Sequence, residues 1–223
     1  MTGFILGTKG EHSQTFAENG ERIPTTFIHT SPCFITEIKT KERDGYTAIQ
    51  LGFGSCKKIQ KPVKGILDKA GIKTPLRFLR EFPLSVNAQV VIENDKKLLK
   101  IGELKFGIGM EIKSSTFFKI GDKVSISGYA KGKGFQGVVK RHHFKGGSRT
   151  HGQSDRERAP GSIGMTTTPG RVFKGKRMAG RMGNQRVTIT NYKIIGFSDT
   201  GLTVKGLVTG SKTNLVEVLL ANK

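Results

Sequence analysis

The sequence predicts a mainly-β protein, a barrel or a sandwich, with one short helical segment and one long, extended basic loop. Three observations lead to this fold class. Short runs alternate apolar and polar residues with the period of a half-buried strand. Turns that contain glycine separate many of these runs. A cationic, glycine-rich stretch with almost no core-forming residues then interrupts them.

In the first half of the chain, the clearest strands are expected at Thr26–His29, Phe34–Lys39 and Thr47–Phe53. Asp44-Gly45 predicts a hairpin turn between the last two, because Asp-Gly favours tight turns between strands. Val124–Ser127 alternates in the same way after a turn at Gly121-Asp122.

Pro62–Ala70 is the best helix candidate in the chain. Pro62 suits the first helical position and Gly71 provides a stop signal. Further along, Val86–Glu93 and Leu98–Leu104 flank Asn94-Asp95, which predicts one more hairpin.

Strands are expected again in the last part of the chain. They lie at Val187–Thr190, Lys193–Ile195, Leu202–Val208 and Leu215–Leu220.

The stretch from Ala130 to Arg186 is poor in apolar residues and carries more than half of the net charge of the chain. It holds 14 Lys and Arg against two acids, a net charge of +12 out of +21, and only four Val, Leu or Ile residues. Such a segment cannot bury enough apolar area to offset its ordering entropy, so alone it should be disordered. A flexible linker is the alternative, but a linker needs no such charge. An arm that orders against phosphates explains both the glycines and the cations. Nucleic acid is the first partner that fits, and an anionic membrane surface is the second.

Two glycine motifs in this stretch resemble nucleotide-binding loops. Gly132–Gly137 matches the dinucleotide pattern, but Val138–Phe144 does not read as the helix that should follow. Gly170–Arg177 is close to the phosphate-binding loop of ATPases, yet Arg177 stands where the magnesium-binding hydroxyl belongs. We therefore expect no nucleotide cofactor and no small-molecule substrate.

The histidines and cysteines give no strong metal or catalytic signal. His142, His143 and His151 have no cysteine nearby and many cations around them, so polar contacts or stacking on RNA are favoured over zinc. Cys33 and Cys56 read as two reduced, buried thiols. No nucleophile–base pair or carboxylate pair stands out, so neither a metal nor an enzymatic activity is expected.

Three phenylalanines, Phe135, Phe144 and Phe173, lie among the cations of the arm. They could stack on unpaired bases or anchor the arm to the body. For Phe135, next to the last strand before the arm, we expect anchoring. Asp155 and Glu157 each adjoin an arginine, which predicts ion pairs within the arm.

Several motifs in order along the chain resemble the bacterial type of the large-subunit ribosomal protein L-three family, over essentially the whole length. They include Gly7-Thr8-Lys9, Arg43-Asp44-Gly45-Tyr46 and Lys69-Ala70-Gly71 in the first part. Most specific are Lys131–Arg141, Thr150-His151-Gly152, Pro160–Gly164 and Thr168–Gly180.

The resemblance implies a β-barrel body of the translation-protein type and a long arm that penetrates 23S-type rRNA. Residues 1–130 would form the first part of the body, with a helical segment near 61–71 and the extra hairpin at 86–104. Residues 131–183 would form the arm, and 184–223 the closing strands. The expected function is that of a structural constituent of the large subunit, not an enzyme. It would bind rRNA near its 3′ end, support early assembly, and send its arm toward the peptidyl transferase centre.

Carried over to this sequence, the resemblance names two groups of arm residues. The side chains expected to bind rRNA are Lys131, Lys133, Lys140, Arg141, His142, His143, Lys145, Arg149, His151, Arg156, Arg158, Arg171, Lys174, Lys176, Arg177 and Arg181. The residues expected to let RNA approach the backbone, or to form the arm tip, are Gly132, Gly134, Gly161, Ser162, Ile163, Gly164 and Met165.

The expected partners are 23S-type rRNA and neighbouring large-subunit proteins, with no membrane. The expected location is a cytoplasmic ribosome, with an organelle-encoded ribosome as the alternative. Three departures from the family pattern stand out. Met165 replaces a frequent glutamine that some members methylate, so no methylated tip is expected. Glu11-His12-Ser13 replaces the usual Met-Thr, and the segment at 86–104 is longer than usual.

Overall fold

A computed structural model describes residues 3–84, 88–93, 96–101 and 104–221. The chain divides into two compact units. We call Met1–Tyr129 with Arg186–Lys223 the barrel unit, and Ala130–Gln185 the arm unit.

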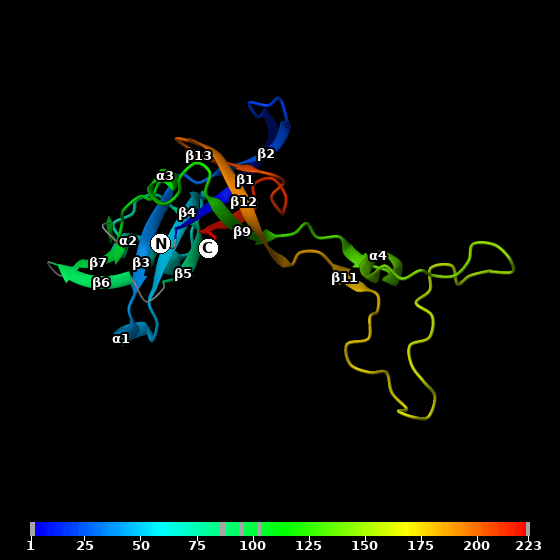
Figure 1. Cartoon of the computed structure of the whole chain (residues 1–223). Coiled ribbons are helices and arrows are strands. Elements are labelled where there is room, and N and C mark those ends of the chain that lie inside the picture. The colour runs from blue at the N-terminus through cyan, green and yellow to red at the C-terminus, as the bar shows by residue number, and fades with distance from the viewer. Residues whose placement is uncertain (1–2, 85–87, 94–95, 102–103, 222–223) are drawn as a thin grey trace. The chain divides into compact units, whose positions relative to one another are not determined.

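Six antiparallel strands of the barrel unit close into a barrel, in the order β1-β14-β9-β12-β13-β2 (Figure 1). Their bounds are β1 Phe4–Phe16, β2 Arg22–His29, β9 Lys123–Tyr129, β12 Arg186–Ser198, β13 Gly201–Lys205 and β14 Leu215–Leu220. The predicted mainly-β fold class is confirmed. The two strands expected at 187–190 and 193–195 are one strand, β12, with an irregularity between Ile189 and Tyr192. Asn191 has a φ of 65° at that point, which bends the strand without ending it.

The N-terminal strand β1 belongs to the core on both of its faces. Phe4, Ile5 and Leu6 are all buried, although neighbouring side chains of a strand point to opposite faces. One face looks into the barrel, and the strand also packs on β3 (Cys33–Lys39) and β4 (Ala48–Ser55) of a second sheet. That sheet has the order β3-β4-β5, with β5 at Leu76–Pro83. Phe4 stacks on Phe82 of β5 with ring centroids 5.2 Å apart, so one hydrophobic core joins the barrel and the sheet.

The connection between β3 and β4 is not the tight hairpin turn that Asp44-Gly45 predicted. The one-turn helix α1 (Lys41–Asp44) occupies it, and Gly45 ends that helix with a φ of 81°. The two strands still pair antiparallel, as expected. Glycine in the left-handed region serves a helix C-cap as well as a hairpin turn, so the sequence signal was ambiguous.

The predicted helix is present as α2, Lys61–Lys69. Pro62 lies in its first turn, and Gly71 follows its end with a φ of 70°. Leu67 of α2 packs with Ile72 and Leu76 in a small second hydrophobic cluster, which fixes one face of the helix to the sheet.

A third sheet has the order β6-β7-β8, with β6 at Ala88–Glu93, β7 at Lys96–Ile101 and β8 at Leu104–Gly107. The described parts of the segment at 86–104 therefore contain an antiparallel pair, β6 with β7. Residues 86, 87, 94, 95, 102 and 103 of that prediction lie outside the described residues. A further one-turn helix, α3 (Ser114–Phe117), follows. None of the helices in the described ranges has the length and apolar character that crossing a membrane requires.

The arm unit holds three short elements close to its two ends. They are β10 (Gly134–Gln136), α4 (Val138–His142) and β11 (Gly180–Met182). Residues 143–179 contain neither helix nor strand. This matches the composition of the segment, which lacks the apolar side chains that a packed core needs.

Candidate nucleic-acid interface

The two ends of the arm unit are held together by backbone pairing. β10 pairs with β11 in antiparallel register, with Phe135 opposite Arg181. Gly183 follows β11 with a φ of 74°, and a Cβ added there would lie 2.3 Å from the backbone oxygen of Lys131. Only glycine fits this approach, which fixes the root from which residues 143–179 extend.

The helix α4 follows β10 directly, contrary to the expectation that no helix comes after Gly132–Gly137. It is only five residues long, and the three-residue strand before it pairs antiparallel with β11. A dinucleotide-binding fold needs a longer helix between parallel strands. The short helix and the antiparallel pairing therefore argue against a nucleotide site at this position. Val138 is buried at the start of α4 and gives the root a small apolar contact.

Two of the side chains expected to bind rRNA also serve the arm's own structure. Arg141 Nη1 donates a hydrogen bond of 2.6 Å to the backbone oxygen of Met178, and His142 Nε2 lies 3.1 Å from the same oxygen. Gly180 makes room for this contact, because a Cβ there would lie 2.6 Å from Arg141 Nη1. The two side chains thus join the outgoing and the returning chain, a role that their charge alone did not indicate.

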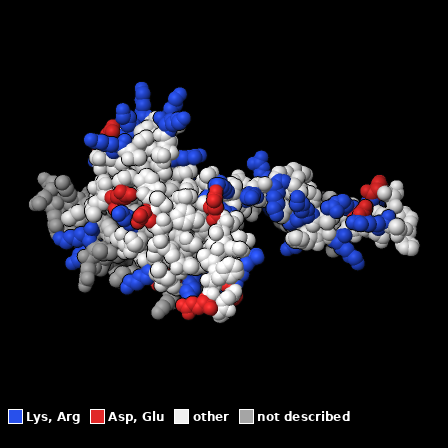
Figure 2. All heavy atoms as spheres, turned by 90° about the horizontal axis from the view of Figure 1, so that it is seen from above, with Lys and Arg blue, Asp and Glu red and all other residues white. Residues whose placement is uncertain are grey.

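The other fourteen candidate side chains are exposed. One of them, Arg149, forms an ion pair with Glu157 at 3.0 Å, the only ion pair within the fully described arm unit. The prediction of ion pairs within the arm is confirmed for Glu157, although its partner lies eight residues earlier and is not adjacent, whereas Asp155 forms no ion pair with a described residue. Figure 2 shows Lys and Arg far outnumbering acids along this unit, so its cations face solvent with little internal compensation.

The glycines that were expected to let RNA approach the backbone have free space around their α-carbons. Nothing lies within 4 Å of a Cβ built at Gly134 or Gly161, and both have positive φ. At Gly132 and Gly164 a Cβ would make ordinary contacts at 3.8 Å. The arm's own packing therefore does not demand glycine at these last two positions.

At the expected tip, all of residues 161–178 are exposed. Ser162 Oγ donates a 2.9 Å hydrogen bond to the backbone oxygen of Gly164, which folds the chain back locally. The side chain of Met165 is 79% exposed and Ile163 is 45% exposed. Two apolar side chains are thus exposed rather than packed in a core.

Phe135 does not anchor the arm, and that expectation was wrong. Its side chain is 77% exposed on β10. Phe173 is also exposed, at 58%, while the ring of Phe144 lies 6.1 Å from that of His142. Phe135 and Phe173 are free to stack on unpaired bases.

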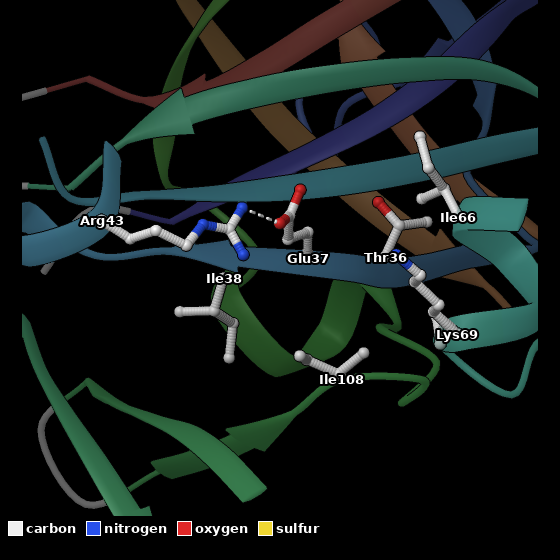
Figure 3. A pocket seen from close by; sticks show the side chains of 8 residues that line it. Thr36, Glu37, Ile38, Arg43, Ile66, Lys69 and Ile108 are labelled. Atoms are coloured by element: carbon white, nitrogen blue, oxygen red, sulfur yellow. Dashed lines mark hydrogen bonds and ion pairs between the residues drawn. The ribbon is translucent and has the colours of Figure 1, made fainter. Parts of the chain in front are cut away.

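A hollow of about 310 Å³ lies in the barrel unit between β3, α2 and the loop after β8 (Figure 3). Arg43 points at the carboxylate of Glu37 and forms an ion pair with it, and Lys39 lies 3.3 Å from the same carboxylate. Burial alone would raise the pKa of Glu37, but hydrogen bonds and charge from Arg43 and Lys39 outweigh it and lower this pKa. Glu37 is therefore held as a paired anion, unlike a general acid.

Metal-ligating side chains are not grouped in the part of the chain that the structure describes: no three His, Cys, Asp or Glu come together there. His142 is directed to a backbone oxygen, and His143 and His151 are exposed. Cys33 is buried in the core, and Cys56 is half-buried with weak contacts to Pro75 and Leu76.

The sequence matches one protein family from the third sheet through the arm to the last strand. The family model described as "Ribosomal protein L3" matches residues 96–218, more than half of the chain. The chain belongs to the ribosomal protein L3 family. The resemblance seen in the motifs is thereby confirmed.

Curated L3 relatives match the chain over nearly its full length. "Large ribosomal subunit protein uL3" of Herpetosiphon aurantiacus is 47% identical over 227 residues, which cover 100% of this chain and 98% of that protein. The protein of the same name from Chlorobaculum tepidum is 44% identical over 225 residues, covering 99% and 100%. That of Dehalococcoides mccartyi is 42% identical, covering 98% of each chain. Body and arm are thus shared together with these relatives.

Proposed function

We propose that this chain is a structural, non-catalytic constituent of the large ribosomal subunit, as the names of its relatives indicate. Its arm binds 23S-type rRNA near the 3′ end of that molecule. The arm extends toward the peptidyl transferase centre, and binding supports early assembly. The barrel body then lies beside neighbouring large-subunit proteins, in a cytoplasmic ribosome.

The observation that supports this proposal is that the cations of the arm are exposed and almost all lack an acidic partner within the arm unit. Fourteen candidate side chains are exposed on a segment without a core, and within the arm unit only Arg149 has an acidic partner. Like charges held this close repel one another, so the arrangement is favourable when a polyanion is bound. Exposed Phe135 and Phe173 add stacking surfaces, which favour RNA with unpaired bases over an anionic membrane.

The test is salt-dependent binding of the full chain to a transcript of the 3′ region of large-subunit rRNA. In one variant, Lys174, Lys176, Arg177 and Arg181 are changed to Gln. Each neutralised phosphate contributes roughly −0.7 to −0.9 to the slope of log affinity against log salt. Losing four contacts should therefore reduce the steepness of that slope by about 3.

The matched control changes four exposed cations of the barrel unit, Lys119, Lys123, Lys193 and Lys205, to Gln. We expect its slope to stay near that of the unmodified chain. An arm variant that binds the transcript like the unmodified chain, with the same salt dependence, would refute the assignment of the arm to RNA.

A further inference from the structure

The barrel unit carries a second concentration of cations, centred on α2. Between residues 56 and 77 there are seven cations and one acid, Asp68, a net charge of +6 in 22 residues. This density exceeds that of the arm. The α2 patch, as we name it, consists of Lys57, Lys58, Lys61, Lys64, Lys69, Lys73 and Arg77.

The fold brings these seven residues together. Residues 56–75 connect β4 to β5, which are adjacent antiparallel strands, and Ser55 is paired with Leu76. The backbone N–H of Cys56 also donates to the oxygen of Pro75 at 3.0 Å. The loop before α2 and the loop after it therefore start and end side by side, with the helix between them.

The helix presents its cations on one fixed face. Val63, Leu67 and Ala70 turn toward the sheet in the small hydrophobic cluster, whereas Lys61, Lys64 and Lys69 are exposed. At 1.5 Å of rise per residue, Lys61 and Lys69 stand roughly 12 Å apart along the axis. This is a rigid row of charges, unlike the arm residues at 143–179, which lie in neither helix nor strand.

All seven side chains of the patch are exposed, and none forms an ion pair with another described residue. Asp68, the one acid of this segment, is exposed and forms no ion pair with a described residue, and the acids around Lys39 are engaged by that cation. Glu37, Asp44 and Glu81 surround Lys39, at 3.3, 3.6 and 3.9 Å. The uncompensated charge of the α2 patch costs repulsion in the free protein, and a polyanion removes that cost.

The patch has the chemistry of phosphate contact rather than base recognition. Residues 56–77 contain no aromatic side chain that could stack on a base. Arg77 lies over the ring of the half-buried Phe78, with its guanidinium 4.9 Å from the ring centroid. A rigid row of lysines without stacking surfaces suits the regularly spaced phosphates of a duplex, where the bases are paired and inaccessible.

We propose that the α2 patch is a second RNA-binding surface, which contacts the phosphate backbone of a double-stranded rRNA segment independently of the arm. This inference rests on the proposed rRNA-binding function and adds a partner surface to it. The arm would engage RNA with flexible backbone and exposed aromatic rings. The patch would hold a helical segment by charge alone.

The experiment uses the full chain in which Lys57, Lys58, Lys61 and Lys64 are changed to Gln, with the same 3′-region rRNA transcript as probe. We expect the salt slope to be less steep by about 3 and the affinity near 0.15 M salt to fall about a hundredfold. Hydroxyl-radical footprinting should show lost protection of a duplex segment while other protections persist. Changing the same four lysines to Arg keeps the charge and should restore both affinity and footprint.

Comparison with the arm variant separates the two proposals. Combining both sets of substitutions should add their slope changes, because the two surfaces bind separately. If the α2 variant binds and protects the transcript like the unmodified chain while the arm variant does not, the second surface is refuted and the arm's role stands. Such a result would assign the patch to an acidic protein instead. If neither variant changes binding, the proposed function itself falls.

Discussion

Replacing the buried lysine of the barrel, Lys9, with methionine tests how the barrel holds residues 206–214, the loop between β13 and β14. Lys9 lies in β1 and is only 6% exposed. Its Nζ donates hydrogen bonds to the backbone oxygens of Val208 at 2.6 Å and Gly210 at 2.8 Å. The backbone of Lys9 adds two more bonds to the same loop, to Asn214 and Thr213. Methionine keeps the aliphatic stem and removes only the charged donor.

The expected magnitude follows from those two bonds. A hydrogen bond from a charged donor contributes about 1.5 to 3 kcal/mol, and removing the donor leaves the carbonyl oxygens without that partner. Lys9→Met should therefore lower the free energy of unfolding by about 4 kcal/mol. For a chain of this size each kcal/mol corresponds to about 2–4 °C, so the melting temperature should fall by about 10 °C.

Urea and thermal unfolding followed by circular dichroism measure this loss. Lys212→Met is the matched control, because Lys212 makes an exposed ion pair with Glu11 and such pairs add little stability. If Lys9→Met were no more destabilised than Lys212→Met, the two hydrogen bonds could not hold the loop as argued.

Three further predictions use the barrel unit. Gly201→Ala should lower the free energy of unfolding by about 3 kcal/mol, because the new Cβ would lie 2.1 Å from the backbone oxygen of Ile28. Gly196→Ala is the control, since its Cβ would meet nothing within 4 Å, and urea unfolding that gives the two variants equal stability would contradict the prediction. Burial, aided by nearby negative charge, raises the pKa of Cys33 to about 12. In a C56S variant, which keeps Cys33, a thiol reagent at pH 8 should therefore react only when the protein unfolds, and rapid reaction with the folded variant would contradict this. Glu37→Gln should lower the free energy of unfolding at neutral pH. Because the pKa of Glu37 is lowered in the folded state, the difference in stability between the variant and the unmodified chain should shrink as the pH falls below the ordinary pKa of about 4.3. A difference that stays constant with pH would argue against the ion pairs as its cause.

Local signals in the sequence were sufficient to predict a helix or a strand where a single physical cause determines that element. Pro62 and Gly71 bracket α2 because proline presets the φ of the first helical turn and glycine tolerates the positive φ that ends the helix. The barrel strands Val124–Ser127 and Leu215–Leu220 alternate because one face is inside and one outside, and both are present as β9 and β14.

Prediction failed where packing between distant segments decides the structure. β1 was not expected, since only its first residues are apolar, and its later residues are held by pairing with β2 rather than by burial. β5 was missed for a different reason, because its apolar residues Leu76, Phe78, Leu79 and Phe82 do not keep the strict alternation that indicates a strand. In the arm, the composition located the basic residues but could not predict where each side chain points. The contacts of Arg141 and His142 with the backbone oxygen of Met178 were therefore not predictable from the sequence.

The pairing of β1 with β14 sets the order in which this protein can be completed during synthesis. Phe4 is opposite Leu219, so the barrel closes between the strand made first and the strand made last. Three of its six strands, β12, β13 and β14, follow the arm along the chain. A growing chain therefore exposes its long cationic arm while half of the barrel is still unmade. Contacts between residues so far apart in sequence form slowly, because loop closure must precede them. An RNA present at that stage would meet the arm before it meets a finished fold.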